Sequence, residues 1–311
     1  MDYQRPPRVS VLDPVGQAIG HVRQMLFTPF DLSKWFIVGF CAWLAYLGRS
    51  GFPNFNFNFN NGRHPFGPDG PAMPAMKETV ISHLPVIFIM AAILIPIVII
   101  ISLILCWLQS RGQFMFVHCV AGNVAEITIP WKKFSRHGNS LFLFKFVLWI
   151  TGMLLILIPV AIIIIIGISI HAAGSSAMGA AGIIASVFGI FVIVAAFILV
   201  DKFTNDFVVP IMFMQTSSII AGWRTFLAML GNNKVRFLLY ILFQIAISIV
   251  ISFIILMICL VGCCFCCASI LLLIPYIGTV ILLPLLAFKR AYSLFYLSQF
   301  GPQFDVFIKP V

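Results

Sequence analysis

The sequence predicts an all-α integral membrane protein with six transmembrane helices and interfacial amphipathic elbow helices. The first observation is composition: 61% of the 311 residues are hydrophobic and 9% are charged. Soluble domains contain about 45–50% apolar and about 25% charged residues. The second observation is that the apolar residues form long uncharged runs, and about 20 such residues cross a bilayer. Together they exclude soluble, disordered and disulfide-framework proteins.

Three regions are expected along the chain. Residues 1–34 form a cytoplasmic N-terminal segment with an amphipathic helix, because Val15, Ile19, Val22 and Leu26 recur at helical spacing. Residues 35–288 form the membrane domain, which includes an outer loop at 49–83, and residues 289–311 form a cytoplasmic tail.

Six apolar runs define the predicted spans, and helices are expected because lipid offers backbone groups no other hydrogen-bond partners. The runs are 35–47, 84–108, 141–170, a run that ends at Val200, 236–258 and 269–288. The first run is short, and it crosses fully only if it extends to Phe52 with Arg49 reaching the interface.

The basic residues predict the orientation. Of the 19 Lys and Arg residues, all but Arg49, Arg63 and Lys77 lie before the first span, after the last one, or in the second and fourth connections. Positive charge is retained in the cytoplasm, so both termini are expected there. The net charge of +10 is then expected to meet anionic lipid headgroups, and it is not evidence for nucleic acid.

The second and fourth connections resemble each other. The order Trp-basic-x-Phe followed by Gly-Asn occurs at 131–139 and again at 223–232. In the second copy Ile219, Trp223, Phe226, Leu227 and Leu230 follow helical spacing, which favours an in-plane amphipathic helix. Together with the N-terminal helix, these two connections predict a three-fold hairpin repeat. The alternative is that any basic loop beside a membrane acquires such residues.

The densest polar segment follows the fourth span, at 201–210. The candidate site is Asp201 and Asp206 with Arg111, Lys289 and Arg290 at similar depth. Carboxylates at a membrane boundary can bind a cation or relay protons. The alternative is a set of interfacial ion pairs that fix helix ends, and it is favoured because nothing charged lies at midspan.

Two further patterns leave alternatives open. Five cysteines fall between Cys259 and Cys267 in the order C-x-x-x-C-C-x-C-C, which could bind a soft metal or form disulfides, but which more often reflects close helical packing. Residues 54–61 alternate Asn and Phe, which indicates either a partner-binding strand or a low-complexity loop resting on the outer leaflet.

No known catalytic motif is present, and no two of the six histidines have the spacing of a helical metal pair. We therefore expect no catalytic residues, no cofactor and no resident metal, and we expect the protein not to be an enzyme.

Four stretches carry a family resemblance: WFIVGFCAWLAYLG, GFPNFNFNFNN, NDFVVPIMF and LLPLLAFKRAYSLFYLSQFG. Between Trp35 and Phe304 the chain resembles a group of uncharacterised prokaryotic six-helix membrane proteins. That group is distantly similar to the membrane domain fused to glycerophosphodiester phosphodiesterases. The resemblance implies the architecture only, because the chain has no room for the soluble barrel that a phosphodiesterase needs.

The expected function is that of a lipid-associated accessory or scaffold protein of the cell inner membrane. Its expected partners are membrane lipids, including anionic headgroups, together with a membrane protein or a second copy of the chain. The alternative is a small transporter or channel with an acidic site at the inner face. An intramembrane lipid enzyme is the weakest hypothesis.

Overall fold

The computed structural model describes residues 9–47, 73–173, 176–264 and 274–307, and within them it contains helices and no strand. In order these are α1 (Asp13–Phe27), α2 (Leu32–Tyr46), α3 (Met73–Gly122), α4 (Thr128–Lys133), α5 (Ser135–Ala173), α6 (Ser176–Phe203), the π-helix η1 (Thr204–Val208), α7 (Val209–Gln215), α8 (Ile219–Asn232), α9 (Lys234–Cys264), α11 (Pro275–Ile281), α12 (Leu283–Ser298) and the 3₁₀-helix η2 (Pro302–Phe304). The predicted all-α class is confirmed.

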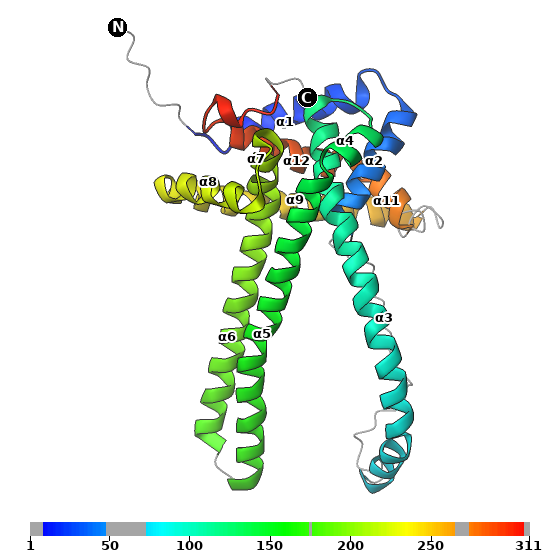
Figure 1. Ribbon diagram of the computed structural model, residues 1–311, viewed down its shortest axis with the longest axis vertical. Coiled ribbons are helices and arrows are strands. Elements are labelled where there is room, and N and C mark those ends of the chain that lie inside the picture. Colours follow the sequence, from blue (N-terminus) through cyan, green and yellow to red (C-terminus); the bar gives the residue numbers. More distant parts are fainter. Residues whose placement is uncertain (1–8, 48–72, 174–175, 265–273, 308–311) are drawn as a thin grey trace.

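Helices α3, α5 and α6 extend from a layer that the other described helices form at one end of the molecule (Figure 1). α5 and α6 lie side by side as an antiparallel hairpin, and α3 diverges from them. Residues 89–110 and 146–200, which form most of these long helices, contain no Asp, Glu, Lys or Arg. Apart from Lys77 and Glu78 in the first turns of α3, the charged residues that the structure describes therefore lie at the layer.

Four helices in the described ranges are long and apolar enough to cross a bilayer: Ala92–Gly122, Ser135–Ser169, Ala181–Gln215 and Lys234–Ile258. Most of their apolar side chains are exposed on the protein surface. Soluble proteins rarely expose apolar surface on this scale, so the chain is a membrane protein. Six spans are not confirmed.

The first predicted span, 35–47, forms α2, which packs on the layer end of α3. Gln113 Nε2 donates to the carbonyl oxygen of Ala45 at 2.6 Å, and Lys34 Nζ donates to Asn123 Oδ1 at 2.8 Å. A Cβ on Gly112 would lie 2.5 Å from the carbonyl carbon of Leu44. α2 has 15 residues, which is too short for a crossing, and this close approach holds it within the layer.

The helix that contains the second span begins earlier than expected. The sequence predicts residues 73–83 in the outer loop, but they form the first turns of α3. Proline is tolerated within the first turn of a helix, so Pro74 is compatible with this start. The alternating Asn and Phe residues at 54–61 lie outside the described residues.

α9 contains the fifth predicted span, 236–258, but it does not run alongside the other long helices. It lies across them at their layer end, as α8 also does (Figure 1). One face of α9 carries Tyr240 and Gln244, which are buried against the layer. In the described residues the expected hairpin of fifth and sixth spans is absent, and Tyr240 packs instead on Tyr292 and Tyr296 of α12. The side chains of the predicted cysteine cluster lie outside the described residues.

The sixth predicted span, 269–288, is divided where it is described. α11 ends at Ile281 and α12 begins at Leu283 with a proline in its first turn. Proline supplies no backbone N–H and favours a helix start at this point. α12 continues through the predicted boundary at residue 288, and its side chains from Ala287 to Leu297 are largely buried at the centre of the layer.

An aromatic cluster around Phe207 forms the core of the layer. Phe207 stacks on Phe226 with ring centroids 5.4 Å apart and contacts Phe237 and Tyr240 at 5.2 and 4.8 Å. All four side chains are essentially buried. The cluster joins η1 to α8 and α9.

The N-terminal segment packs on α12. Tyr292 Oη donates to the carbonyl oxygen of Val11 at 3.1 Å. α1 buries Ala18, Val22, Met25 and Leu26, whereas Ile19, expected on the apolar face, is 55% exposed. The buried face is thus rotated from the predicted one.

The three-fold repeat is not confirmed. Phe134 and Phe226 are both buried, as equivalent positions would be. The helices that precede them differ, however, because α4 has 6 residues and α8 has 14. Gly231 and Asn232 end α8, but Gly138 and Asn139 lie inside α5.

Candidate polar site at the junction of α6, α9 and α12

The site is built on a local widening of the helix that continues α6. Residues Thr204–Val208 form the π-helix η1, and π segments inside α-helices frequently mark functional sites because they change the direction of side chains. The Thr204 hydroxyl donates to the carbonyl of Val200 at 2.6 Å. Asn205 Nδ2 donates to the backbone carbonyl and to the carboxylate of Asp201, at 2.6 and 2.9 Å.

Asp206 lies at the centre of a hydrogen-bonded chain. Its Oδ2 atom is 2.9 Å from Nζ of Lys202 and accepts a hydrogen bond from the Tyr240 hydroxyl at 3.1 Å. Gln244 Nε2 donates in turn to that hydroxyl oxygen at 3.0 Å. Both members of the ion pair are largely buried, so screening by water is weak. The chain ties η1 to α9.

Arg290 brings α12 into the same site. It is 4% exposed, and its Nη1 atom donates to the carbonyl oxygen of Asn205 at 2.6 Å. Arg290, Lys289, Lys202 and Asp206 line a cavity of about 60 Å³ together with Asn205, Gln113 and Tyr46. The lining therefore contains three cations and one carboxylate.

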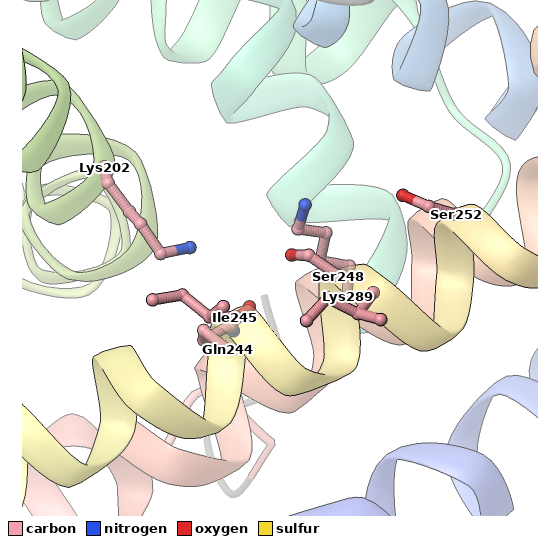
Figure 2. A pocket seen from close by; sticks show the side chains of 7 residues that line it. Lys202, Gln244, Ile245, Ser248, Ser252 and Lys289 are labelled. Carbon is pink, nitrogen blue, oxygen red and sulfur yellow. The ribbon is translucent and has the colours of Figure 1, made fainter.

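A larger groove of about 500 Å³ adjoins this cavity. Figure 2 shows the amino groups of Lys202 and Lys289 directed into the groove from α6 and α12. α9 forms the rest of the lining, with Gln244, Ser248, Ser252 and two isoleucines. The groove is thus basic on one side and contains hydroxyl groups on the other.

A third hollow, of about 750 Å³, lies between α3 and the α5–α6 hairpin. We call it the crevice. Its lining is mostly apolar, and its polar residues include Lys145 and Asp201, whose Nζ and Oδ1 atoms are 4.0 Å apart. These two residues lie near the layer, so polarity is concentrated at one end of the crevice.

The structure brings together four of the five predicted site residues. Asp206, Lys289 and Arg290 line one cavity, and Asp201 is joined to them through Asn205. Arg111 does not take part. Its guanidinium group lies between the rings of Trp107 and Trp131, at 4.4 and 5.0 Å from their centroids. Cation–π attraction accounts for this placement. The position of Arg111 relative to the predicted span ends does not reveal it.

The prediction missed the polar face of α9. Tyr240, Gln244, Ser248 and Ser252 recur every fourth residue within an otherwise apolar helix, so they share one face. This spacing was a signal in the sequence, but a search for uncharged apolar runs passes over it. Lys202 and Asn205 lie in the predicted polar segment and were not among the predicted site residues.

The tyrosines of α12 are neutral hydrogen-bond donors. Burial raises the pKa of Tyr296 to about 12 and raises the pKa of Tyr292 as well, because an ionised phenolate would lose its hydration. Their rings contact Tyr240, with centroids 4.6 and 5.9 Å from it. They fix the position of α9 without adding negative charge to the site.

No group of three or more His, Cys, Asp or Glu side chains that could hold a metal ion occurs in the described ranges. No curated protein matches the chain, and no solved structure matches it. Residues 9–283 match the family of unknown function DUF7544. Because this match covers most of the chain, the protein belongs to that family.

Proposed function

We propose that the protein is a multi-pass cell-membrane protein that acts as a lipid-associated accessory or scaffold and catalyses no reaction. The observation that carries the proposal is the crevice of about 750 Å³ between α3, α5 and α6. A crevice that is apolar along its length and polar at one end matches the shape and polarity of a phospholipid.

The crevice is lined by apolar side chains that the protein itself leaves uncovered. Trp149, Met153 and Ile198 line it and are 55%, 52% and 61% exposed. Exposing such side chains to water costs about 25 cal/mol per Å². Acyl chains remove this cost, so lipid is the occupant that the lining favours.

The orientation rests on charge. The layer contains basic residues of several helices, including Arg23, Lys132, Lys133 and Arg136. The positive-inside rule then places the layer, and both chain ends with it, at the cytoplasmic face. The in-plane placement of α8 and the likeness to the membrane domain of glycerophosphodiester phosphodiesterases belong to this proposal as its finer parts.

Native mass spectrometry of the full chain in mild detergent tests the proposal. We expect phospholipid to remain bound after purification. Ser102 lines the crevice, so Ser102→Trp should reduce the bound phospholipid by filling the space. Ile104 lies on the same helix and outside the crevice lining, so Ile104→Trp should leave lipid binding unchanged. A monodisperse protein that retains no lipid contradicts the proposal.

A small transporter or channel is the second candidate, and the placement of Asp206 favours it. The carboxylate lines a cavity beside three cations, which is an arrangement that ion carriers use near a gate. In reconstituted vesicles, replacing Asp201 and Asp206 by Asn should then change ion or solute flux. Equal flux with both chains, or none with either, removes this candidate.

A further inference from the structure

The groove between α6, α9 and α12 has the charge of an anion site. Lys202 and Lys289 both direct their amino groups into it (Figure 2), and Arg290 lies in the adjoining cavity. Asp206 is the one carboxylate among the residues that line the two hollows. A surplus of two positive charges remains, and in a partly buried site it attracts an anion strongly.

Gln244 presents a buried acceptor that needs a hydrogen-bond donor. The Tyr240 hydroxyl donates its proton to Asp206, so it can only accept from Gln244, and the amide nitrogen must face it. This fixes the orientation of the amide. The oxygen Oε1 of Gln244 is then left buried without a hydrogen-bond partner, in a side chain that is 1% exposed. Buried acceptors are usually satisfied, so this oxygen indicates a donor supplied by a ligand.

The surroundings of the groove indicate a lipid rather than a soluble ion. Ile245 and Ile249 line the groove and are 52% and 65% exposed. α9 lies across the layer ends of the long helices (Figure 1), at the depth that headgroups take in the proposed membrane. An occupant that meets basic, hydroxyl and apolar groups together is amphipathic.

We propose that this groove binds the headgroup of an anionic phospholipid that carries a hydroxyl group. The lysines and the Ser248 hydroxyl hold the phosphate, the headgroup hydroxyl donates to Gln244, and the isoleucines contact the acyl chains. The inference rests on the proposed function, and it names the lipid class and a site distinct from the crevice.

The test measures headgroup preference rather than total lipid. The purified full chain is titrated with phosphatidylglycerol or phosphatidylcholine, and bound lipid is counted by native mass spectrometry. We expect phosphatidylglycerol to be preferred by the unaltered protein. Lys289→Gln should weaken that preference about 10-fold, which is the effect of losing one charge-assisted hydrogen bond. Lys289→Arg should restore it.

Two further variants separate a local effect from misfolding or loss of charge. Ser248→Leu fills the groove without a change in charge, and it should lower the preference even if Lys289→Gln fails to fold. Lys234→Gln removes the same charge from an exposed position of α9, outside the groove lining, and it should leave the preference unchanged.

Each outcome decides between sources and proposals. If glycerol phosphate or inorganic phosphate displaces phosphatidylglycerol at equal concentration, the site binds soluble phosphate esters and the lipid assignment is wrong. If the preference for phosphatidylglycerol is the same in Ser248→Leu, Lys289→Gln and Lys234→Gln, the proposed headgroup site is also wrong. Lipid that is retained without headgroup preference overturns this inference alone, whereas a chain that retains no lipid overturns the proposed function.

Discussion

Gly112 shows how a single residue sets the position of a helix. It lies where α3 crosses α2, and an added Cβ would meet the backbone of Leu44 and Ala45 at 2.5–2.6 Å. Backbone atoms cannot move aside as flexible side chains can. α2 and α3 must therefore separate to accept any larger residue, which would also strain the bond from Gln113 to Ala45.

We expect Gly112→Ala to lower the melting temperature clearly, because overpacking costs about 1–3 kcal/mol. Gly20→Ala is the matched control. Gly20 lies in α1, and a Cβ added there would have nothing within 4 Å of it, so alanine should be neutral or stabilise by up to about 1 kcal/mol through helix propensity. Equal melting temperatures for the two variants would show that the α2–α3 contact is looser than described.

His21 gives the layer a pH dependence. Its Nε2 atom lies 2.7 Å from the carbonyl oxygen of Val120, and the ring lies against Phe295 and Phe307. Burial lowers the pKa of His21 below its usual value, and the positive charge of Lys34 lowers it further, although the bond to Val120 opposes them. The unfolded chain therefore binds a proton at a higher pH than the folded one does.

The sign follows from linkage: stability is lost as the pH falls from about 6.5 through the lowered pKa of the folded state. The melting temperature should be lower at about pH 5 than at about pH 7.5. A His21→Gln variant, which keeps a donor to Val120 and cannot be charged, should show a smaller drop. An identical drop in both proteins would assign the pH dependence to other groups.

At the scale of elements, η1 directs the polar side chains of the site. A π segment corresponds to one residue inserted into an α-helix. Deleting Thr204 should return the helix to regular α-geometry and redirect the side chains inside the segment, whereas the residues that follow it keep nearly their present angle relative to α6. Asp206 would then leave Lys202 and Tyr240, and the headgroup preference should fall together with the melting temperature.

Deletion of Thr151 in the exposed middle of α5 is the control for shortening a helix. It should change the packing of α5 on α6 without removing the Asp206 contacts. If the Thr204 deletion kept both headgroup preference and stability, the π segment would have no part in arranging the site.

Comparison with the sequence shows which elements local patterns can predict. Long uncharged runs predicted the helices that became α3, α5 and α6, because hydropathy alone decides that a segment leaves water. The run at 236–258 was equally apolar, but its placement depends on long-range contacts such as those of Tyr240 with Tyr292 and Tyr296 of α12. The polar segment at 201–210 was found from its composition. The π-helix within this segment was not predicted, because a π-helix has no simple sequence pattern.

Arg111 and Arg290 show the same limit at the level of the site. Each was assigned to the site from its depth along the chain. Arg290 is held there by the carbonyl of Asn205, whereas Arg111 is held away by two tryptophans, Trp107 and Trp131. Trp131 lies 20 residues further along the same connection, and nothing in the spacing shows that it folds back onto Arg111, so only the fold decides between the two placements.

At the scale of the whole molecule, the proposed orientation can be tested by labelling. A single cysteine at Ser176, where α6 begins far from the layer, should react with an impermeant maleimide added to intact cells, in a chain without other cysteines. A single cysteine at Arg224, an exposed residue of α8, should react only after the membrane is opened. The reverse pattern would place the layer outside.

The contact between α1 and α12 bears on how the protein is made. Tyr292 of α12 donates to the carbonyl oxygen of Val11, which lies just before α1 and is separated from Tyr292 by 281 residues. The long apolar helices lie between these two residues in sequence. During synthesis those helices can enter the membrane while α1 still waits for its partner. The layer therefore closes only after translation has passed α12, and until then the apolar face of α1 remains available to chaperones or to the membrane surface.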